Sequence, residues 1–122
     1  MIRVLLVDDQ PAIRRMLKLR LGLEPDLQVV GEAGDGLEAL RWTRHLTPDV
    51  VVMDVDIPRM DGLAVTEALH LVAPQSRVVI LTMHDTRPVR ERAREAGALA
   101  FVPKQADEVL LLSAIRHSGA AG

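Results

Sequence analysis

The stretch Val50-Val51-Val52-Met53-Asp54 is a short apolar run that ends in a carboxylate. Prolines bound it, with Pro48 before it and Pro58 after it, and a β-branched run of this length is typical of a strand buried on both faces. Asp54 would therefore lie where the strand leaves the core. In open parallel α/β sheets the carboxyl ends of the strands line the ligand crevice, so a carboxylate at this place favours a role in chemistry.

The chain has 122 residues, which is enough for one domain with a single core and too few for two. Its 17 acidic and 15 basic residues give a formal net charge of -2, so electrostatics provides no reason to expect nucleic-acid binding by this segment. The absence of cysteine excludes disulfides and thiol chemistry. The longest apolar run is far shorter than the roughly 18 residues that span a bilayer, and the first residues lack the features of a signal peptide. We therefore expect a cytoplasmic protein without a membrane partner.

Apolar runs alternate with helical patterns along the chain. The expected strands cover residues 2–7, 27–30, 50–54, 77–82 and 99–102, and the expected helices cover residues 11–24, 37–46, 63–72, 87–96 and 106–117. Three glycines assign residues 31–36 to a loop. This alternation predicts an α/β fold with a five-stranded parallel sheet covered by helices on both faces. Residues 119–122 have no periodicity and are interpreted as a tail or the start of a linker, which leaves residues 1–118 as the domain.

Five polar residues lie at the carboxyl ends of four of the expected strands, namely Asp8, Asp9, Asp54, Thr82 and Lys104. Each alone has a plain structural interpretation, such as a residue at a helix N-terminus, a packed strand residue or a surface lysine. Because the carboxyl ends of parallel strands share one edge of the sheet, all five would meet in one cleft. This convergence predicts a common site.

Three carboxylates within about 5 Å repel one another by several kcal/mol, unless a cation joins them or one of them stays protonated. Oxygen ligands, with no His or Cys at the strand ends, favour Mg²⁺ over zinc, with Mn²⁺ as an alternative. With the metal bound, Asp54 could attack a phosphoryl group as a carboxylate nucleophile. Lys104 and the Thr82 hydroxyl would then contact the oxygens of that group.

These residues resemble those of the receiver domain of bacterial two-component response regulators. The motifs that carry the resemblance are Asp8-Asp9, Asp54 followed by Ile57-Pro58-Arg59-Met60-Asp61-Gly62, Thr82, and Lys104 preceded by Gly97-Ala98-Leu99-Ala100-Phe101-Val102-Pro103. The resemblance covers nearly the whole chain and implies a flavodoxin-like (βα)5 fold with the sheet order 2-1-3-4-5. Residues 31–36 and 81–85 look most like the NarL/LuxR-type branch, whose members usually carry a C-terminal helix-turn-helix domain that binds DNA.

The resemblance also implies how the acidic residues divide their roles. Asp54 would accept the phosphoryl group from a sensor histidine kinase. Asp9, Asp54 and the backbone carbonyl of Asp56 would bind Mg²⁺, and Asp8 would act through a metal-bound water.

A second group of residues would respond to the phosphoryl group. Lys104 would hold its oxygens. Thr82 and Phe101 would form a switch pair, in which the hydroxyl moves toward the phosphoryl group and the aromatic ring turns inward behind it. Asp56 and His84 lie two residues beyond Asp54 and Thr82, at positions that commonly modulate how fast an aspartyl-phosphate is lost in such domains.

Two residues depart from the pattern of the family. Met83 is bulkier than the small residue that most receivers carry beside the switch threonine, and it could narrow access to the site. Ala100 stands where glycine is common, which leaves the backbone path into Phe101 open. Neither departure removes a metal ligand or the phosphoacceptor.

The expected function is signal transduction. The output would be homodimerisation or docking to a DNA-binding domain outside this chain, through the fourth helix, fifth strand and fifth helix or through the first and fifth helices. The chain would be no enzyme beyond catalysing its own phosphorylation and dephosphorylation. The alternatives are a single-domain receiver that acts by protein–protein interaction, a magnesium-dependent phosphohydrolase, a flavodoxin-type carrier and a phosphorylation-independent interaction module. The phosphohydrolase is disfavoured because Asp8-Asp9-Gln10 lacks the Asp-x-Asp pattern, and the carrier because Gln10-Pro11-Ala12 is no phosphate loop.

Overall fold

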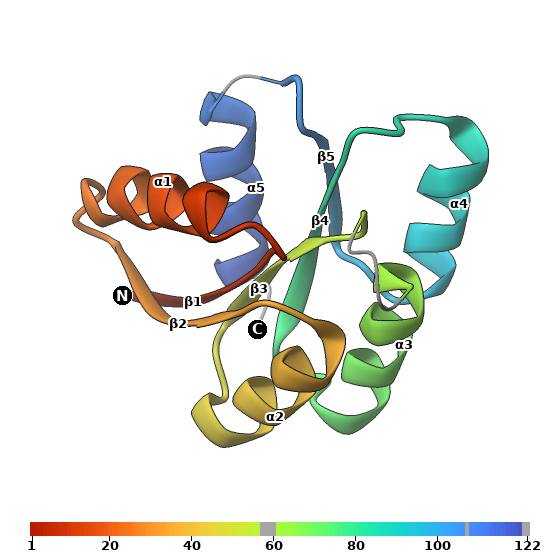
Figure 1. Ribbon diagram of the computed structural model, residues 1–122, viewed down its shortest axis with the longest axis horizontal. Helices are drawn as coiled ribbons and strands as arrows, with labels where there is room; N and C mark the ends of the chain where they lie inside the picture. The colour runs from red at the N-terminus through yellow and green to blue at the C-terminus, as the bar shows by residue number, and fades with distance from the viewer. Residues whose placement is uncertain (57–60, 107, 121–122) are drawn as a thin grey trace.

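Strands and helices alternate along the whole chain in the computed structural model, which describes residues 1–56, 61–106 and 108–120 (Figure 1). The elements are, in order, β1 (Ile2–Val7), α1 (Pro11–Gly22), β2 (Leu27–Ala33), α2 (Gly36–Leu46), β3 (Val50–Asp54), α3 (Gly62–Val72), β4 (Arg77–Thr82), α4 (Arg87–Glu95), β5 (Ala100–Pro103) and α5 (Glu108–Ala120). The number, type and order of the expected elements are confirmed.

All neighbouring strands of the sheet run parallel, in the order β2-β1-β3-β4-β5. The predicted fold class and the strand order implied by the resemblance are both confirmed. Strand β3 lies in the middle, with β1 on one side and β4 on the other. Its side chains alternate between the two faces of the sheet. Val51 and Met53 belong to the hydrophobic core on one face, and Val50 and Val52 belong to the core on the other. This double burial explains why the run is apolar without alternation.

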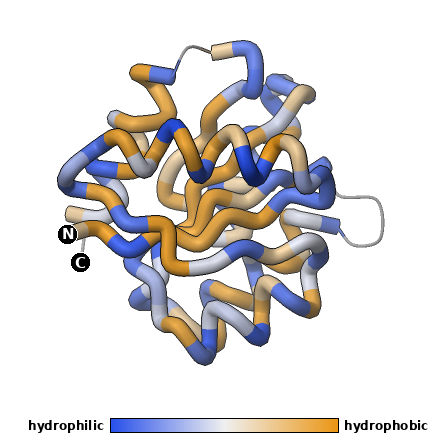
Figure 2. The backbone as a smooth tube through the Cα atoms, turned by 60° about the vertical axis from the view of Figure 1, so that its left-hand side comes forward, coloured by the Kyte–Doolittle hydropathy of each residue, from blue (hydrophilic) through white to orange (hydrophobic). Residues whose placement is uncertain are grey.

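The helices form a layer on each face of the sheet. Residues of α2, α3 and α4 pack with one set of strand residues, and residues of α1 and α5 pack with the other set (Figure 1). The strands in the middle of the molecule are coloured as mostly hydrophobic, whereas the helices mix both colours (Figure 2). No helix among the residues that the structure describes is long and apolar enough to cross a bilayer.

The expected loop at residues 31–36 is wrong in its first half, because β2 continues to Ala33. Gly31 pairs with Leu5 after a shift in register between Val4 and Leu5. A Cβ atom at Gly31 would lie 2.8 Å from Leu46 Cδ1, so the glycine lets the last residue of α2 pack against the strand. This glycine marks a close approach and not a break in the strand.

The expected end of the last helix at residue 117 is too early, because α5 runs to Ala120. Gly119 lies against the side chain of Ile2, the first residue of β1, at the amino edge of the sheet. The contact lies beyond Ile115, the last apolar residue of the helical pattern in the sequence. Residues 121–122 are outside the described residues.

Candidate functional site

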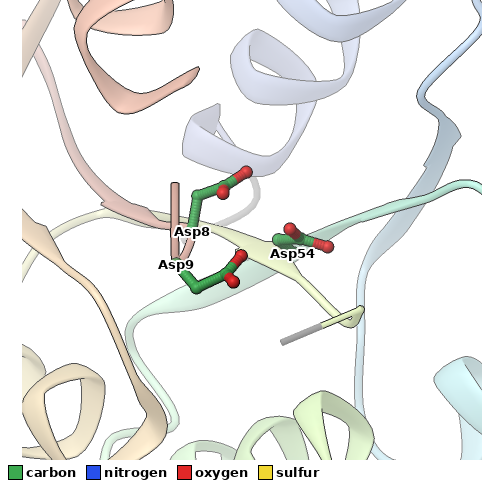
Figure 3. A group of neighbouring side chains, drawn as sticks. All are labelled: Asp8, Asp9 and Asp54. Carbon is green, nitrogen blue, oxygen red and sulfur yellow. The ribbon is translucent and has the colours of Figure 1, made fainter. Parts of the chain in front are cut away.

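Two neighbouring strands bring three carboxylates together. β1 leads directly into Asp8 and Asp9, β3 ends on Asp54, and Val7 pairs with Met53. One carboxylate oxygen from each of these aspartates lies within 4.8 Å of the others. The three side chains lie close together at the carboxyl edge of the sheet (Figure 3).

Burial makes this acidic cluster electrostatically costly. Asp8 and Asp54 are each only 2% exposed, whereas Asp9 is half-buried. Burial raises the pKa of Asp8 to about 6 and the charge of Asp54 adds to the rise, against the Gln10 N–H, which donates to Asp8 Oδ1 at 2.9 Å. Arg14, which the sequence analysis did not single out, donates at 2.6 Å to the backbone carbonyl of Asp8 and not to its carboxylate. Arg14 therefore does not offset the charge of the three carboxylates, and their mutual repulsion is what a bound cation would relieve.

Lys104 lies on the other side of Asp54. It follows β5 directly, and its backbone N–H donates to the carbonyl of Thr82 at 2.8 Å. Its Nζ lies 2.9 Å from Asp54 Oδ1 and 3.5 Å from Asp56 Oδ2. Burial lowers the pKa of Lys104, but the hydrogen bond to Asp54 and the nearby carboxylates outweigh it and raise the pKa overall. Lys104 is therefore positively charged at neutral pH and forms an ion pair with Asp54, the expected phosphoacceptor.

The end of β4 supplies a buried hydroxyl. Thr82 is fully buried, one residue beyond Leu81, which pairs with Asp54. The Thr82 hydroxyl oxygen accepts a hydrogen bond from the backbone N–H of His84 at 2.9 Å. The bond fixes the start of the loop after β4 to the threonine, so a movement of this hydroxyl would also move the loop.

Asp56 connects the same loop to the lysine. Its carboxylate accepts a hydrogen bond from the Met83 N–H at 3.0 Å, and its Oδ1 lies 3.1 Å from His84 Nδ1. Burial raises the pKa of Asp56, but these two hydrogen bonds and the charge of Lys104 hold it below its ordinary value. From the sequence, only the backbone carbonyl of Asp56 was assigned to the metal. The contacts of its carboxylate with Lys104 and with the loop after β4 were not predicted.

The two departures from the family pattern are accommodated. The side chain of Met83 is 52% exposed and lines a groove of about 530 Å³ between α1 and α5. Ala100 begins β5 in register with Val79, and among the described residues only Thr47 and Gly97 have positive φ values. The backbone into Phe101 is therefore ordinary extended strand, which alanine adopts as readily as glycine does.

Phe101 is half-buried and packs against the core beneath α2, α3 and α4. The guanidinium carbon of Arg90 lies 4.7 Å from the centre of its ring, and Arg90 also forms an ion pair with Asp85. Sequence reasoning missed Arg90, since no motif contains it. Its place over the ring depends on how α4 is rotated against β5.

Part of the family motif that follows Asp54 falls on residues 57–60, which lie outside the described residues. The motif resumes at Asp61, whose carboxylate accepts the Leu63 N–H at 2.9 Å and so caps α3. A Cβ atom at Gly62 would lie 2.5 Å from the Cα atom of Val55. Glycine at this position is therefore required by the close approach of α3 to the end of β3.

Comparison with protein families gives a match to the response regulator receiver domain over residues 4–116. The chain belongs to this family. An uncharacterized transcriptional regulatory protein of Bacillus subtilis, YxjL, is 36% identical over 115 residues, which cover 94% of this chain and 53% of that protein. A protein-glutamate methylesterase/protein-glutamine glutaminase of Carboxydothermus hydrogenoformans is 39% identical over 94% of this chain and 34% of its own length.

Among solved structures, a LuxR-family two-component response regulator from Aurantimonas superposes with a TM-score of 0.93 and 37% identity, covering 98% of this chain and 86% of that one. The receiver family and its LuxR/NarL-type relatives are thereby confirmed. The chain spans about half of the length of the B. subtilis regulator and one third of that of the methylesterase. The shared part is the receiver, which is a regulatory fold.

Proposed function

We propose that Asp54 accepts a phosphoryl group from a sensor histidine kinase and that the domain changes conformation in response. The observation that supports this most directly is the arrangement around Asp54. Its carboxylate is buried, lies 2.9 Å from Lys104 and shares an acidic cluster with Asp8 and Asp9. A purely structural ion pair would need the lysine alone, and the two additional carboxylates add repulsion between like charges that such a pair would not require.

The oxygen donors of the cluster fit a hard divalent cation, because the three carboxylates converge within 4.8 Å and include no soft ligand. Asp9, Asp54 and the backbone carbonyl of Asp56 would hold Mg²⁺, or Mn²⁺ in its place, and Asp8 would contact it through a water. When bound, this ion supplies positive charge that offsets the carboxylates and the oxygens of the incoming phosphoryl group.

The residues of the chain then divide the transfer among them. A carboxylate oxygen of Asp54 forms a bond to phosphorus while the bond from phosphorus to the donor's histidine nitrogen breaks. Lys104 shifts its ion pair from Asp54 to the phosphoryl oxygens, and the proximity of its Nζ means that the shift is short. The Thr82 hydroxyl donates a hydrogen bond to the same oxygens.

This new hydrogen bond is the proposed start of the conformational change. The loop after β4 follows Thr82 through the His84 N–H, and the ring of Phe101 turns inward to fill the space behind the threonine. Moving a two-state equilibrium from 1:99 to 99:1 takes about 5.5 kcal/mol, which a few charge-assisted contacts can supply. Asp56 and His84, which contact each other at the mouth of the site, would set how fast water removes the phosphoryl group.

The output would lie outside this segment. Because LuxR/NarL-type relatives are transcription regulators, we propose a cytoplasmic regulator that binds DNA through a separate C-terminal helix-turn-helix domain and that forms a homodimer when phosphorylated. The segment itself would not bind nucleic acid. It would act as a regulatory phosphoacceptor and not as an enzyme on other substrates.

Intact-mass spectrometry tests the proposal. The wild-type chain, incubated with acetyl phosphate and Mg²⁺, should gain the mass of one phosphoryl group. The gain should disappear in Asp54→Ala and when the metal is chelated, and it should persist in Asp85→Ala, which removes an exposed carboxylate outside the acidic cluster. No adduct and no release of phosphate from a folded wild-type chain would refute the proposal.

A further inference from the structure

The loop between β1 and α1, residues 8–10, carries two of the three carboxylates of the acidic cluster (Figure 3). Three hydrogen bonds among the described residues hold the start of this loop. The Asp8 N–H donates to the carbonyl of Ala33 at 3.1 Å, and the Gln10 N–H donates to Asp8 Oδ1 at 2.9 Å. The third comes from Arg14, which donates to the Asp8 carbonyl at 2.6 Å. Of the three, only this one has a side chain outside the loop as its donor, so a substitution can remove it without altering the backbone.

Arg14 reaches the loop from the first turn of α1 and also contacts β2. Its Nη1 donates to the Asp8 carbonyl, and its Nε donates to Glu32 Oε1 at 3.2 Å. Glu32 lies in β2, where it pairs with Leu6 of β1. A Cβ atom at Gly34 would lie 3.4 Å from Arg14 Nη1, and the arginine side chain is 19% exposed. The guanidinium is therefore enclosed between α1, the loop and the end of β2.

The two hydrogen bonds of Arg14 fix the orientation of its guanidinium. This group is planar and always charged, and its donors are held in a rigid fork. The Asp8 carbonyl belongs to the planar peptide unit that joins Asp8 to Asp9. Holding this oxygen therefore restricts rotation of that peptide unit, and with it the directions in which the Asp8 and Asp9 side chains leave the backbone. Arg14 thus acts on both carboxylates through the backbone that joins them.

We propose that Arg14 is a positioning residue for the acidic cluster and that Glu32 positions Arg14. The inference rests on the proposed function, in which the cluster binds a divalent cation. Three carboxylates within 4.8 Å of one another repel, and without a cation this repulsion favours movement of Asp8 and Asp9 away from Asp54. The contacts of Arg14 oppose that movement. The cation then meets carboxylates that are already in place, and little of its binding free energy is lost in ordering them.

A plain ion pair between α1 and β2 is the other interpretation of Arg14, and Lys18 provides the comparison. Lys18 lies one turn further along α1, and its Nζ is 3.7 Å from Glu32 Oε2. Its side chain is 59% exposed, as is usual for an ion pair at the surface. A role in joining the helix to the strand would be shared by Arg14 and Lys18. The hydrogen bond to the Asp8 carbonyl distinguishes Arg14 from Lys18.

Titration of the unphosphorylated chain with MgCl2, followed by two-dimensional NMR of the backbone amides, measures the dissociation constant for Mg²⁺. The variants are Arg14→Ala, Arg14→Lys and Glu32→Ala. The matched control is Lys18→Ala, which removes one positive charge and one partner of Glu32 from the same helix. A second measurement needs no metal: amide hydrogen exchange in the presence of a chelator reports how often the Gln10 N–H leaves Asp8 Oδ1. Urea unfolding verifies that each variant is folded under these conditions.

Arg14→Ala should raise the dissociation constant for Mg²⁺ by about tenfold, because groups that orient metal ligands typically contribute at least this much to affinity. Glu32→Ala should raise it less, since Arg14 keeps its bond to the Asp8 carbonyl and loses only its fixed orientation. Arg14→Lys keeps a charged donor without the rigid fork, so it should restore part of the affinity. Lys18→Ala should bind Mg²⁺ like the wild type. The Gln10 amide should exchange faster in Arg14→Ala and at the wild-type rate in Lys18→Ala.

Rates of labelling by acetyl phosphate separate positioning from a general loss of structure. The deficit of Arg14→Ala should shrink as the concentration of Mg²⁺ rises, whereas a damaged site would stay slow at every concentration. Unchanged Mg²⁺ affinity or unchanged Gln10 exchange in Arg14→Ala, an equal loss of affinity in Lys18→Ala, or a deficit that Mg²⁺ does not reduce would overturn the inference and leave the proposed function intact. A wild-type chain that neither binds Mg²⁺ nor gains a phosphoryl group would refute the proposed function and this inference together.

Discussion

Replacing Asp8 with asparagine should stabilise the metal-free protein at neutral pH. The Asp8 carboxylate is 2% exposed, and burial together with the charge of Asp54 raises its pKa to about 6. The protein therefore loses stability when this group is ionised in the folded state. Asparagine keeps an oxygen that can accept the Gln10 N–H at the same place, and it carries no charge.

The size of the effect follows from the shift in pKa. A rise from 3.8 to about 6, at about 1.36 kcal/mol per pKa unit, corresponds to about 3 kcal/mol in the free energy of unfolding. The folded state binds more protons than the unfolded state between these two values. The cost of the charge is thus absent below pH 3.8, grows as the pH rises to about 6, and is complete above that value. The advantage of Asp8→Asn should follow the same course.

Urea unfolding of the wild type and Asp8→Asn, over a range of pH and in the presence of a chelator, measures this difference. Comparing the two proteins at each pH removes the contribution of carboxylates that they share. Asp9→Asn is the matched control, because it removes one charge from the same cluster at a half-exposed position and should gain less. Added Mg²⁺ should stabilise the wild type by about 1.4 kcal/mol at roughly ten times its dissociation constant, and should stabilise Asp8→Asn less.

Two results would refute this reasoning. If Asp8→Asn were no more stable than the wild type at neutral pH, the buried charge of Asp8 would cost nothing. If its advantage were the same at pH values below 3.8, the gain would come from packing and not from ionisation. An equal response of both proteins to Mg²⁺ would separate Asp8 from the proposed metal site.

Three further substitutions test other parts of the molecule. Gly62→Ala should lower the free energy of unfolding by about 2 kcal/mol, because the new Cβ would lie 2.5 Å from the backbone of Val55; an unchanged urea midpoint would contradict this. Lys104→Ala should slow labelling by acetyl phosphate about tenfold, since it removes the cation 2.9 Å from Asp54, and a time course of intact mass that matches the wild type would argue against it. His84→Ala should change the lifetime of the phosphoryl group without abolishing labelling, because the ring contacts Asp56 and not Asp54; decay kinetics identical to those of the wild type would remove His84 from the mechanism.

Much of the fold could be predicted from the sequence, because the central strand β3 is recognisable from its residues alone. The run from Val50 to Asp54 is apolar at every position up to its last residue, and a short β-branched run bounded by prolines is typical of a strand covered on both faces. The boundaries of β2 and α5 could not be predicted in the same way. Gly31 continues a strand because Leu46 packs over it, and Gly119 continues a helix because Ile2 lies against it. Both are long-range contacts that local sequence does not encode.

The candidate site shows a similar division. That Asp8, Asp54 and Lys104 meet could be predicted, because the topology of a parallel sheet brings its strand ends together. The contacts of Arg14 with the carbonyl of Asp8 and of Arg90 with the neighbouring ring could not. They depend on the rotation of a helix and on the reach of a long side chain, and neither leaves a spacing signal.

The contact between Gly119 and Ile2 has a practical consequence. The six residues of β1 rise about 3.3 Å each, so this contact lies about 20 Å from the acidic cluster, at the opposite end of the strand. With Ile2 and Gly119 adjacent, this part of the domain has the geometry of a cassette that can be spliced into a surface loop of a host protein. Reporters attached beside Ile2 and Gly119 would emerge side by side, remote from the acidic cluster, so an intramolecular biosensor could be built without touching Asp54.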